Sequence, residues 1–157
     1  MPSFRNARRV AHRAEEMFDL VADVERYPEF LPLCLGTSVK RPVASAPAVL
    51  IADMDVGYRT VRERFTTRVT LDRQRLKILV DYVDGPFSHL ENIWTFKPEV
   101  KENLAITASR VEFFIDYELK SRMLGSLVGS MFDKAFRSFA DAFVARADEV
   151  YGRRARP

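Results

Sequence analysis

The sequence predicts an α+β fold in which a curved antiparallel sheet wraps around one long C-terminal helix. Helical periodicity runs through residues 124–151, most of the chain between residue 34 and that helix reads as strand, and short turns join the alternating segments. An amphipathic helix and a one-sided sheet must each cover an apolar face. We therefore expect the sheet to enclose the helix and to hold a cavity against it.

The C-terminal helix is predicted from apolar residues that share one face, opposite a charged face, a pattern typical of an amphipathic helix rather than a membrane span. Gly125 and Gly129 weaken its start, by about 1 kcal/mol each relative to alanine. Either the backbone packs closely against a strand there, or the missing side chains leave room for a ligand or let the helix hinge. The apolar face comprises Leu124, Leu127, Val128, Met131, Phe132, Ala135, Phe136, Phe139, Phe143, Ala147 and Val150.

The N-terminal part suits one strand and short helices. Residues 4–11 alternate as a strand does, and residues 13–22 keep helical spacing. Pro28 and Pro32 prevent a continuous helix over residues 23–33, although bulky apolar side chains predict that this segment packs inward.

A meander of strands follows. Alternation predicts strands over residues 59–71, 76–82, 90–96 and 107–117, with a turn at Asp84-Gly85-Pro86. Leu104 and Ile106 have the opposite phase to the last strand, which a bulge would reconcile.

Composition sets the expected domain number and compartment. The chain has 157 residues, 47% hydrophobic and 30% charged, which is typical of one globular domain. We expect that domain to cover residues 1–152, with a basic tail over residues 153–157. Cys34 is the only cysteine, so an internal disulfide is excluded, a buried thiol is expected and the cytoplasm is the default location. No apolar run is long enough to span a membrane, so any membrane contact would be peripheral, at the inner membrane.

Nothing in the sequence predicts bond-making chemistry. His12 and His89 are the only histidines and lie far apart in the chain, with His89 expected to point outward. We find no nucleophile elbow, no phosphate-binding glycine loop and no metal-ligand spacing. We therefore expect neither an enzyme nor a catalytic cofactor.

The expected ligand site is the space between the sheet and the helix. Glu63 and Asn92 interrupt the inward faces of their strands, so they either make structural hydrogen bonds or bind the polar head of an apolar ligand. The aromatic stripe of the C-terminal helix is most simply core, and only its N-terminal half, near the glycines, is expected to line the cavity. The apolar lining is expected to include Tyr27, Phe30, Leu31, Phe65, Tyr82, Phe87, Trp94, Phe113, Met123, Leu127 and Met131.

Three ordered motifs resemble the coenzyme Q-binding protein family, a branch of the START-like, helix-grip superfamily that also includes polyketide cyclase-like proteins. The first is VADVERYPEFLPLC at residues 21–34. The second is GPF at residues 85–87 with LEN at residues 90–92, Trp94 and Phe96. The third is Phe136, AF at residues 142–143 and RA at residues 146–147, ahead of YG at residues 151–152. Leu33 departs from the family, which often has an aromatic residue at that point.

The resemblance implies a helix-grip fold with a hydrophobic tunnel that opens near residues 21–34. It also implies non-catalytic binding of an isoprenoid lipid, ubiquinone above all, in support of respiratory electron transport. Bacterial relatives include ribosome association toxins, which bind a ribosomal subunit and hinder subunit joining. A small-ring cyclase or hydrolase, as in other helix-grip proteins, would need more inward polar residues than Glu63 and Asn92.

The rival function, ribosome binding, needs a cationic surface. Arg62, Arg64 and Arg68 share the outer face of one strand, and Arg75 and Lys77 extend it to the next. The same face is also expected to carry Asp81, Glu91 and Glu112, which would make it a mixed-charge surface. The net charge of +3 is small, no aromatic residues interleave with the arginines, and we do not expect binding to DNA.

Overall fold

The computed structural model describes residues 3–41, 47–58, 60–99 and 108–152. Within these ranges the chain forms seven strands, two α-helices and a 3-10 helix. In chain order the elements are β1 (Ser3–Val10), α1 (Ala14–Ala22), η1 (Val24–Glu29), β2 (Cys34–Lys40), β3 (Ala48–Tyr58), β4 (Val61–Asp72), β5 (Lys77–Asp84), β6 (Phe87–Glu99), β7 (Ala108–Leu119) and α2 (Arg122–Tyr151).

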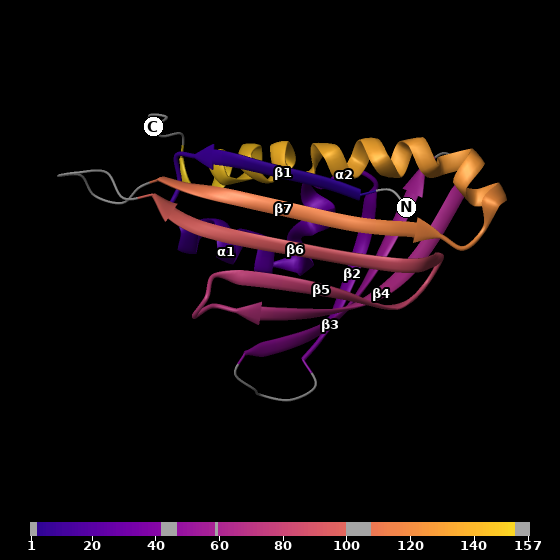
Figure 1. The fold of residues 1–157 in the computed structure, drawn as a ribbon, viewed down its shortest axis with the longest axis horizontal. Helices are drawn as coiled ribbons and strands as arrows, with labels where there is room; N and C mark the ends of the chain where they lie inside the picture. The colour runs from indigo at the N-terminus through magenta and orange to yellow at the C-terminus, as the bar shows by residue number, and fades with distance from the viewer. Residues whose placement is uncertain (1–2, 42–46, 59, 100–107, 153–157) are drawn as a thin grey trace.

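All seven strands form one antiparallel sheet in the order β1-β7-β6-β5-β4-β3-β2. Strands β2 to β7 are a simple meander, and β1 pairs with β7, so the first and last strands of the chain lie side by side. Figure 1 shows α2 running along β1 and β7 while the rest of the sheet curves away beneath it. The predicted α+β, helix-grip arrangement is therefore confirmed, with α1 and η1 as the short helices after the first strand.

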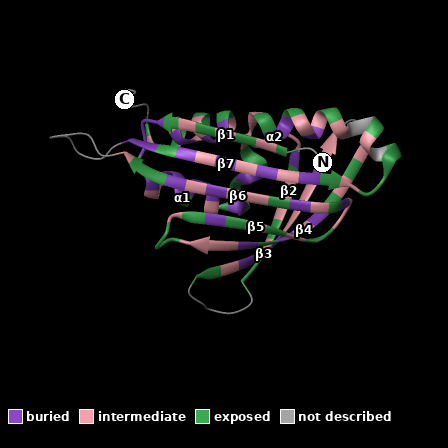
Figure 2. Ribbon diagram, viewed as in Figure 1, coloured by how far each residue is buried: buried purple, intermediate pink, exposed green. Residues whose placement is uncertain are grey.

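The alternation of each predicted strand is also confirmed. In β4 the side chains of Phe65 and Val69 are buried, whereas Arg62, Arg64 and Arg68 are exposed. In Figure 2, buried residues alternate with intermediate or exposed residues along β6 and β7. The strands begin and end within a few residues of the predicted bounds, since hydrogen bonding extends them past the apolar pattern. Leu104, Ile106 and the basic tail lie outside the described residues.

Gly85 forms the predicted turn between β5 and β6. Its φ of +143° belongs to glycine, and a Cβ there would lie 2.5 Å from the Cβ of Phe65. This close approach brings Phe87, the first residue of β6, against Phe65 with ring centroids 5.4 Å apart. The turn therefore helps to build the inner face of the sheet.

The C-terminal end of α2 is tied to the N-terminal part of the chain. The fully buried His12 ring bonds through Nε2 to Asp148 Oδ1 at 2.8 Å, and the Ser109 hydroxyl donates to the His12 carbonyl at 2.9 Å. The Tyr151 hydroxyl donates to the Glu16 carbonyl at 3.1 Å. These contacts fix the end of the helix against β7 and α1.

The start of α2 is different. The helix begins two residues before the predicted start, and the side chain of Met123 is 72% exposed. A Cβ at Gly125 or Gly129 would meet nothing within 4 Å. Close packing of these glycines against a strand, one of the two sequence-based explanations, is therefore wrong, because the glycines face open space. No helix among the described residues is long and apolar enough to cross a membrane.

Candidate functional site

An apolar cavity lies between the concave face of the sheet, η1 and α2. Its volume is about 80 Å³, counted as the space open to the centre of a water molecule. A single water molecule needs about 10–15 Å³ in this measure, so the cavity has room for only a few water-sized groups. Its lining is Val24, Tyr27, Leu31, Pro32, Leu33, Ala52, Met54, Val56, Phe65, Thr67, Val69, Ile78, Val80, Phe87, Leu90, Asn92, Trp94, Ile115, Phe132, Ala135, Phe136, Phe139 and Phe143.

Aromatic rings from the middle of α2 narrow this space. Phe136 packs against Phe139 with ring centroids 5.3 Å apart, and Phe143 packs against Trp94 at 5.1 Å. The expectation that only the N-terminal half of the stripe would line the cavity is wrong, because α2 crosses the concave face with its central turns and Phe139 and Phe143 line the cavity too. These rings are at once core and lining.

The η1 segment closes one side of the cavity. Tyr27 packs edge to face on Phe143 at 5.3 Å and donates its hydroxyl hydrogen to the Val21 carbonyl, and burial raises the pKa of this tyrosine well above its usual value. Leu33 lines the cavity with a φ of 65°, a left-handed conformation that is strained for a leucine. The inward packing predicted for residues 23–33 is confirmed.

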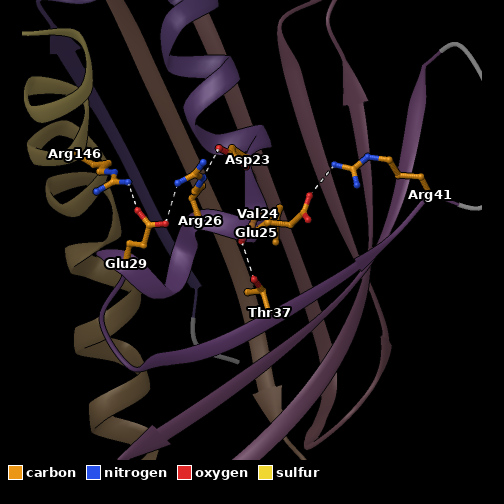
Figure 3. A network of polar contacts seen from close by, with 8 residues as sticks. All are labelled: Asp23, Val24, Glu25, Arg26, Glu29, Thr37, Arg41 and Arg146. Atoms are coloured by element: carbon orange, nitrogen blue, oxygen red, sulfur yellow. Dashed lines mark hydrogen bonds and ion pairs between the residues drawn. The ribbon is translucent and has the colours of Figure 1, made fainter.

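A set of polar contacts holds η1 in place on both sides, as Figure 3 shows. Toward α2, Arg146 binds the Glu29 carboxylate and stacks its guanidinium over the Phe30 ring, 5.2 Å from the centroid. Toward β2, the Thr37 hydroxyl donates to the Val24 carbonyl at 3.1 Å. The hydrogen bond from Arg146 lowers the pKa of Glu29. The wall of the cavity is therefore held by hydrogen bonds and an ion pair at its outer edge as well as by the packing of Tyr27 on Phe143.

Asn92 faces the cavity, but the protein already uses both ends of its amide. Asn92 Nδ2 donates to the Phe114 carbonyl at 2.8 Å, and Trp94 Nε1 donates to Asn92 Oδ1 at 3.0 Å. This geometry supports the structural-hydrogen-bond explanation for Asn92. The amide orients the Trp94 ring against Phe143.

Glu63 lies in a smaller space beside the main cavity. Together with Met131, Phe132 and Leu33 it lines a pocket of about 10 Å³. The side chain of Glu63 makes no hydrogen bond or ion pair with another described residue. Its carboxylate therefore stands near the start of α2, outside the main cavity.

The structure brings together only part of the site expected from the sequence. Tyr27, Leu31, Phe65, Phe87, Trp94 and Asn92 line the main cavity, and Met131 and Glu63 line the pocket beside it. Phe30, Tyr82 and Phe113 pack behind the lining. The expectation for Met123 is wrong because its side chain is exposed, and the Leu127 side chain lies outside the described residues.

Sequence reasoning missed several lining residues, among them Ala52 and Thr67. Both are buried, at 4% and 6% exposure, and pair across β3 and β4. Strand alternation places Thr67 between Phe65 and Val69 on the inward face, and this signal could have identified it.

The outer face of the sheet carries charges of both signs. Arg64 donates from Nε to Asp55 Oδ1 at 2.6 Å, and Arg68 lies opposite Asp81 in the register of β4 and β5. The hydrogen bond between these two side chains lowers the pKa of the Asp55 carboxyl and raises the pKa of the Arg64 guanidinium. The mixed-charge alternative is thus the one that the structure supports.

The contacts and burial of His89 and Cys34 indicate structural roles for both residues. His89 lies on the outer face and contacts Asp116 Oδ2 at 3.0 Å, as its predicted outward orientation requires. Cys34 is buried as predicted, and burial raises the pKa of its thiol to about 11. Within the described residues no three His, Cys, Asp or Glu side chains gather as a metal site.

A curved sheet gripping a long helix around an apolar cavity defines the START-like class of ligand-binding folds. Residues 10–144 match the family of polyketide cyclases, dehydrases and lipid transport proteins, and the chain belongs to that family. A START superfamily protein of Mycobacterium smegmatis shares the fold with a TM-score of 0.76 at 20% identity, covering 94% of this chain and 98% of the other.

Two curated relatives have different names. The ribosome association toxin RatA of Escherichia coli K12 is 36% identical over 154 residues, covering 98% of this chain and 92% of the relative. The mitochondrial coenzyme Q-binding protein COQ10 homolog B of Xenopus laevis is 29% identical over 144 residues, covering 91% of this chain and 57% of the relative. The resemblance seen in the sequence motifs is confirmed. The relatives include both proteins named as toxins and a protein named as quinone-binding.

Proposed function

We propose that this protein binds a neutral prenyl lipid, ubiquinone above all, between its sheet and α2, catalyses no reaction on it, and supports respiratory electron transport. The observation that carries the proposal is the lining of the cavity. Of its polar members, Tyr27, Asn92 and Trp94 already hydrogen-bond within the protein. No charged side chain is among the described lining residues. Such a surface favours an uncharged, mainly apolar guest.

Burial of apolar area supplies the driving force. At about 25 cal/mol per Å² of apolar surface removed from water, each isoprene unit that enters contributes a few kcal/mol before ordering costs. The volume of about 80 Å³ is smaller than a long prenyl chain. Binding therefore requires the rings of α2 to move outward, and the open surroundings of Gly125 and Gly129 at the helix start support such a movement.

Trp94 provides the test, because it is the only tryptophan of the chain and it lines the cavity. Titration with a short-chain ubiquinone is expected to quench its fluorescence saturably, with one quinone per chain in native mass spectrometry. Replacing Ala52 by leucine fills the cavity and is expected to weaken binding, whereas Ala7→Leu on the exposed face of β1 serves as the control. An unsaturable signal and a lipid-free extract of the purified protein would refute the proposal.

Ribosome association is the second candidate, and the 36% identity with the Escherichia coli toxin over nearly the whole chain favours it. The outer face of β4, with Arg62, Arg64 and Arg68, is the surface proposed for docking. Charge reversal of these three arginines is expected to abolish cosedimentation with ribosomal subunits, and cosedimentation by the unaltered protein is expected to fall steeply with added salt. Quinone binding should respond to neither change. Cosedimentation that survives both changes would rule out this surface.

A further inference from the structure

The inner face of the sheet has a shallow hollow over β3 and β4. In the register of β3 and β4, Leu50 lies opposite Val69, Ala52 opposite Thr67, and Met54 opposite Phe65. The middle pair has the smallest side chains of the three, so the inner surface of the sheet is recessed there between two pairs of larger side chains. All six residues face the core, and Ala52 and Thr67 both line the cavity.

Thr67 places a polar group in this hollow. Its side chain is buried at 6% exposure and its hydroxyl has no hydrogen-bond partner among the described residues. The neighbouring threonine of the same strand, Thr66, points outward and bonds to Asp53. Of the four polar residues in the lining, Thr67 alone makes no side-chain hydrogen bond with another described residue.

A hydroxyl that borders an apolar cavity and makes no hydrogen bond with the protein gives the fold nothing that a methyl group of the same size would not. Valine has nearly the shape of threonine and a higher preference for such an apolar strand position, so fold stability does not account for threonine here. A guest with an oxygen atom at this point does account for it, because the hydroxyl would then donate its hydrogen to that oxygen.

We propose that Thr67 is a specificity residue that donates a hydrogen bond to an uncharged oxygen of the bound lipid, as a quinone carbonyl presents. This inference rests on the proposed lipid-binding function and adds the chemical class that the cavity selects. A fatty-acid carboxylate is disfavoured, because the described lining has no cation to compensate its charge. A hydrocarbon would fill the same space but leave the hydroxyl unpaired.

The test compares three variants of the full-length chain. Thr67→Val removes the hydroxyl at constant shape, Thr67→Ser keeps it, and Thr70→Val makes the same change on the outer face of the same strand as the control. Affinities are measured by displacement of the hydrocarbon probe diphenylhexatriene. The competitors are a ubiquinone with two isoprene units, squalene, which is an isoprenoid without oxygen, and palmitate.

Thr67→Val is expected to weaken ubiquinone binding by about threefold to tenfold, the worth of one hydrogen bond. Squalene affinity should not change, Thr67→Ser and Thr70→Val should bind ubiquinone as the unaltered chain does, and palmitate should compete poorly throughout. The lipid-free Thr67→Val protein should melt at the same or a higher temperature, because no internal hydrogen bond is lost.

Three results would overturn the inference. Equal ubiquinone affinity in Thr67→Val and the unaltered chain would show that the hydroxyl does not contact the ligand, while lipid binding itself would stand. A lower melting temperature of lipid-free Thr67→Val would show that the hydroxyl serves the fold. If neither ubiquinone nor squalene displaces the probe from the unaltered chain, the lipid-binding function fails and the role of Thr67 fails with it.

Discussion

The indole of Trp94 and the amide of Asn92 form one unit: Trp94 Nε1 donates to Asn92 Oδ1 at 3.0 Å, two residues away on the same face of β6. The other end of the amide donates to the Phe114 carbonyl on β7. The amide thus joins the neighbouring strand to the ring that packs against Phe143. A polar residue that interrupts an apolar strand here orients an aromatic side chain.

Replacing Asn92 with leucine, which has a similar size, should destabilise the protein by about 1–3 kcal/mol, because a buried indole N–H and a carbonyl lose their partners. Urea unfolding followed by circular dichroism measures the change, and a shift of the Trp94 emission reports the reoriented ring. Thr95→Val, on the outer face of the same strand, is the control. An unchanged unfolding midpoint in Asn92→Leu would contradict this role.

Alanine in place of Gly129 should stabilise the protein by up to about 1 kcal/mol, because alanine is the better helix former and its Cβ meets nothing within 4 Å. The same substitution at Gly85 should destabilise it, because the φ of +143° disfavours any side chain and the Cβ would lie 2.5 Å from that of Phe65. Thermal unfolding of the two variants, measured side by side, checks the contrast. If Gly129→Ala destabilised the protein, the added methyl group would have to clash with a neighbour, which would contradict the open space around Gly129.

The contact between Glu29 and Arg146 should make stability depend on pH. The pKa of Glu29 is lowered from its usual 4.5 in the folded chain, so the fold favours the ionised carboxylate. This stabilisation is present above pH 4.5 and is lost as the pH falls through the lowered pKa. Urea unfolding of Glu29→Gln should therefore show lower stability than the unaltered chain at neutral pH, with a difference that shrinks in acid.

The control for that experiment is Glu91→Gln on the outer face of β6. Glu91 makes no ion pair with another described residue, so its replacement is a matched glutamate-to-glutamine change without such a contact. A constant difference between Glu29→Gln and the unaltered chain at every pH would show that the contact with Arg146 does not depend on the charge of Glu29.

Cys34 should resist thiol reagents in the native protein. Burial raises the pKa of its thiol from 9.0 to about 11, and the thiolate is the reactive form. At pH 8 the shift alone should slow labelling by about a hundredfold relative to the urea-unfolded chain. A disulfide-exchange reagent with a coloured product measures both rates, and similar rates in the two states would contradict the burial of Cys34.

The buried and exposed faces of the strands and the helix could be predicted from the sequence, because they depend on local periodicity. Alternation around Phe65 and Val69 predicted which side of β4 is buried, and the glycine of the Asp84-Gly85-Pro86 turn predicted where β5 ends. Alternation alone left Asn92 open between two roles, since the Phe114 carbonyl that it binds comes from a strand 22 residues later. The pattern does not single out Thr67, because one small polar residue on the apolar face of a strand hardly alters the alternation.

By itself, the sequence determined the α+β class, the inward and outward faces and the family, because these follow from the order and spacing of apolar residues. Only the tertiary structure decided which turns of α2 cross the sheet, that the cavity is narrow, and that Thr67 faces it with no hydrogen-bond partner among the described residues. Those properties depend on how elements distant in the chain pack together, and packing depends on shape as well as on pattern.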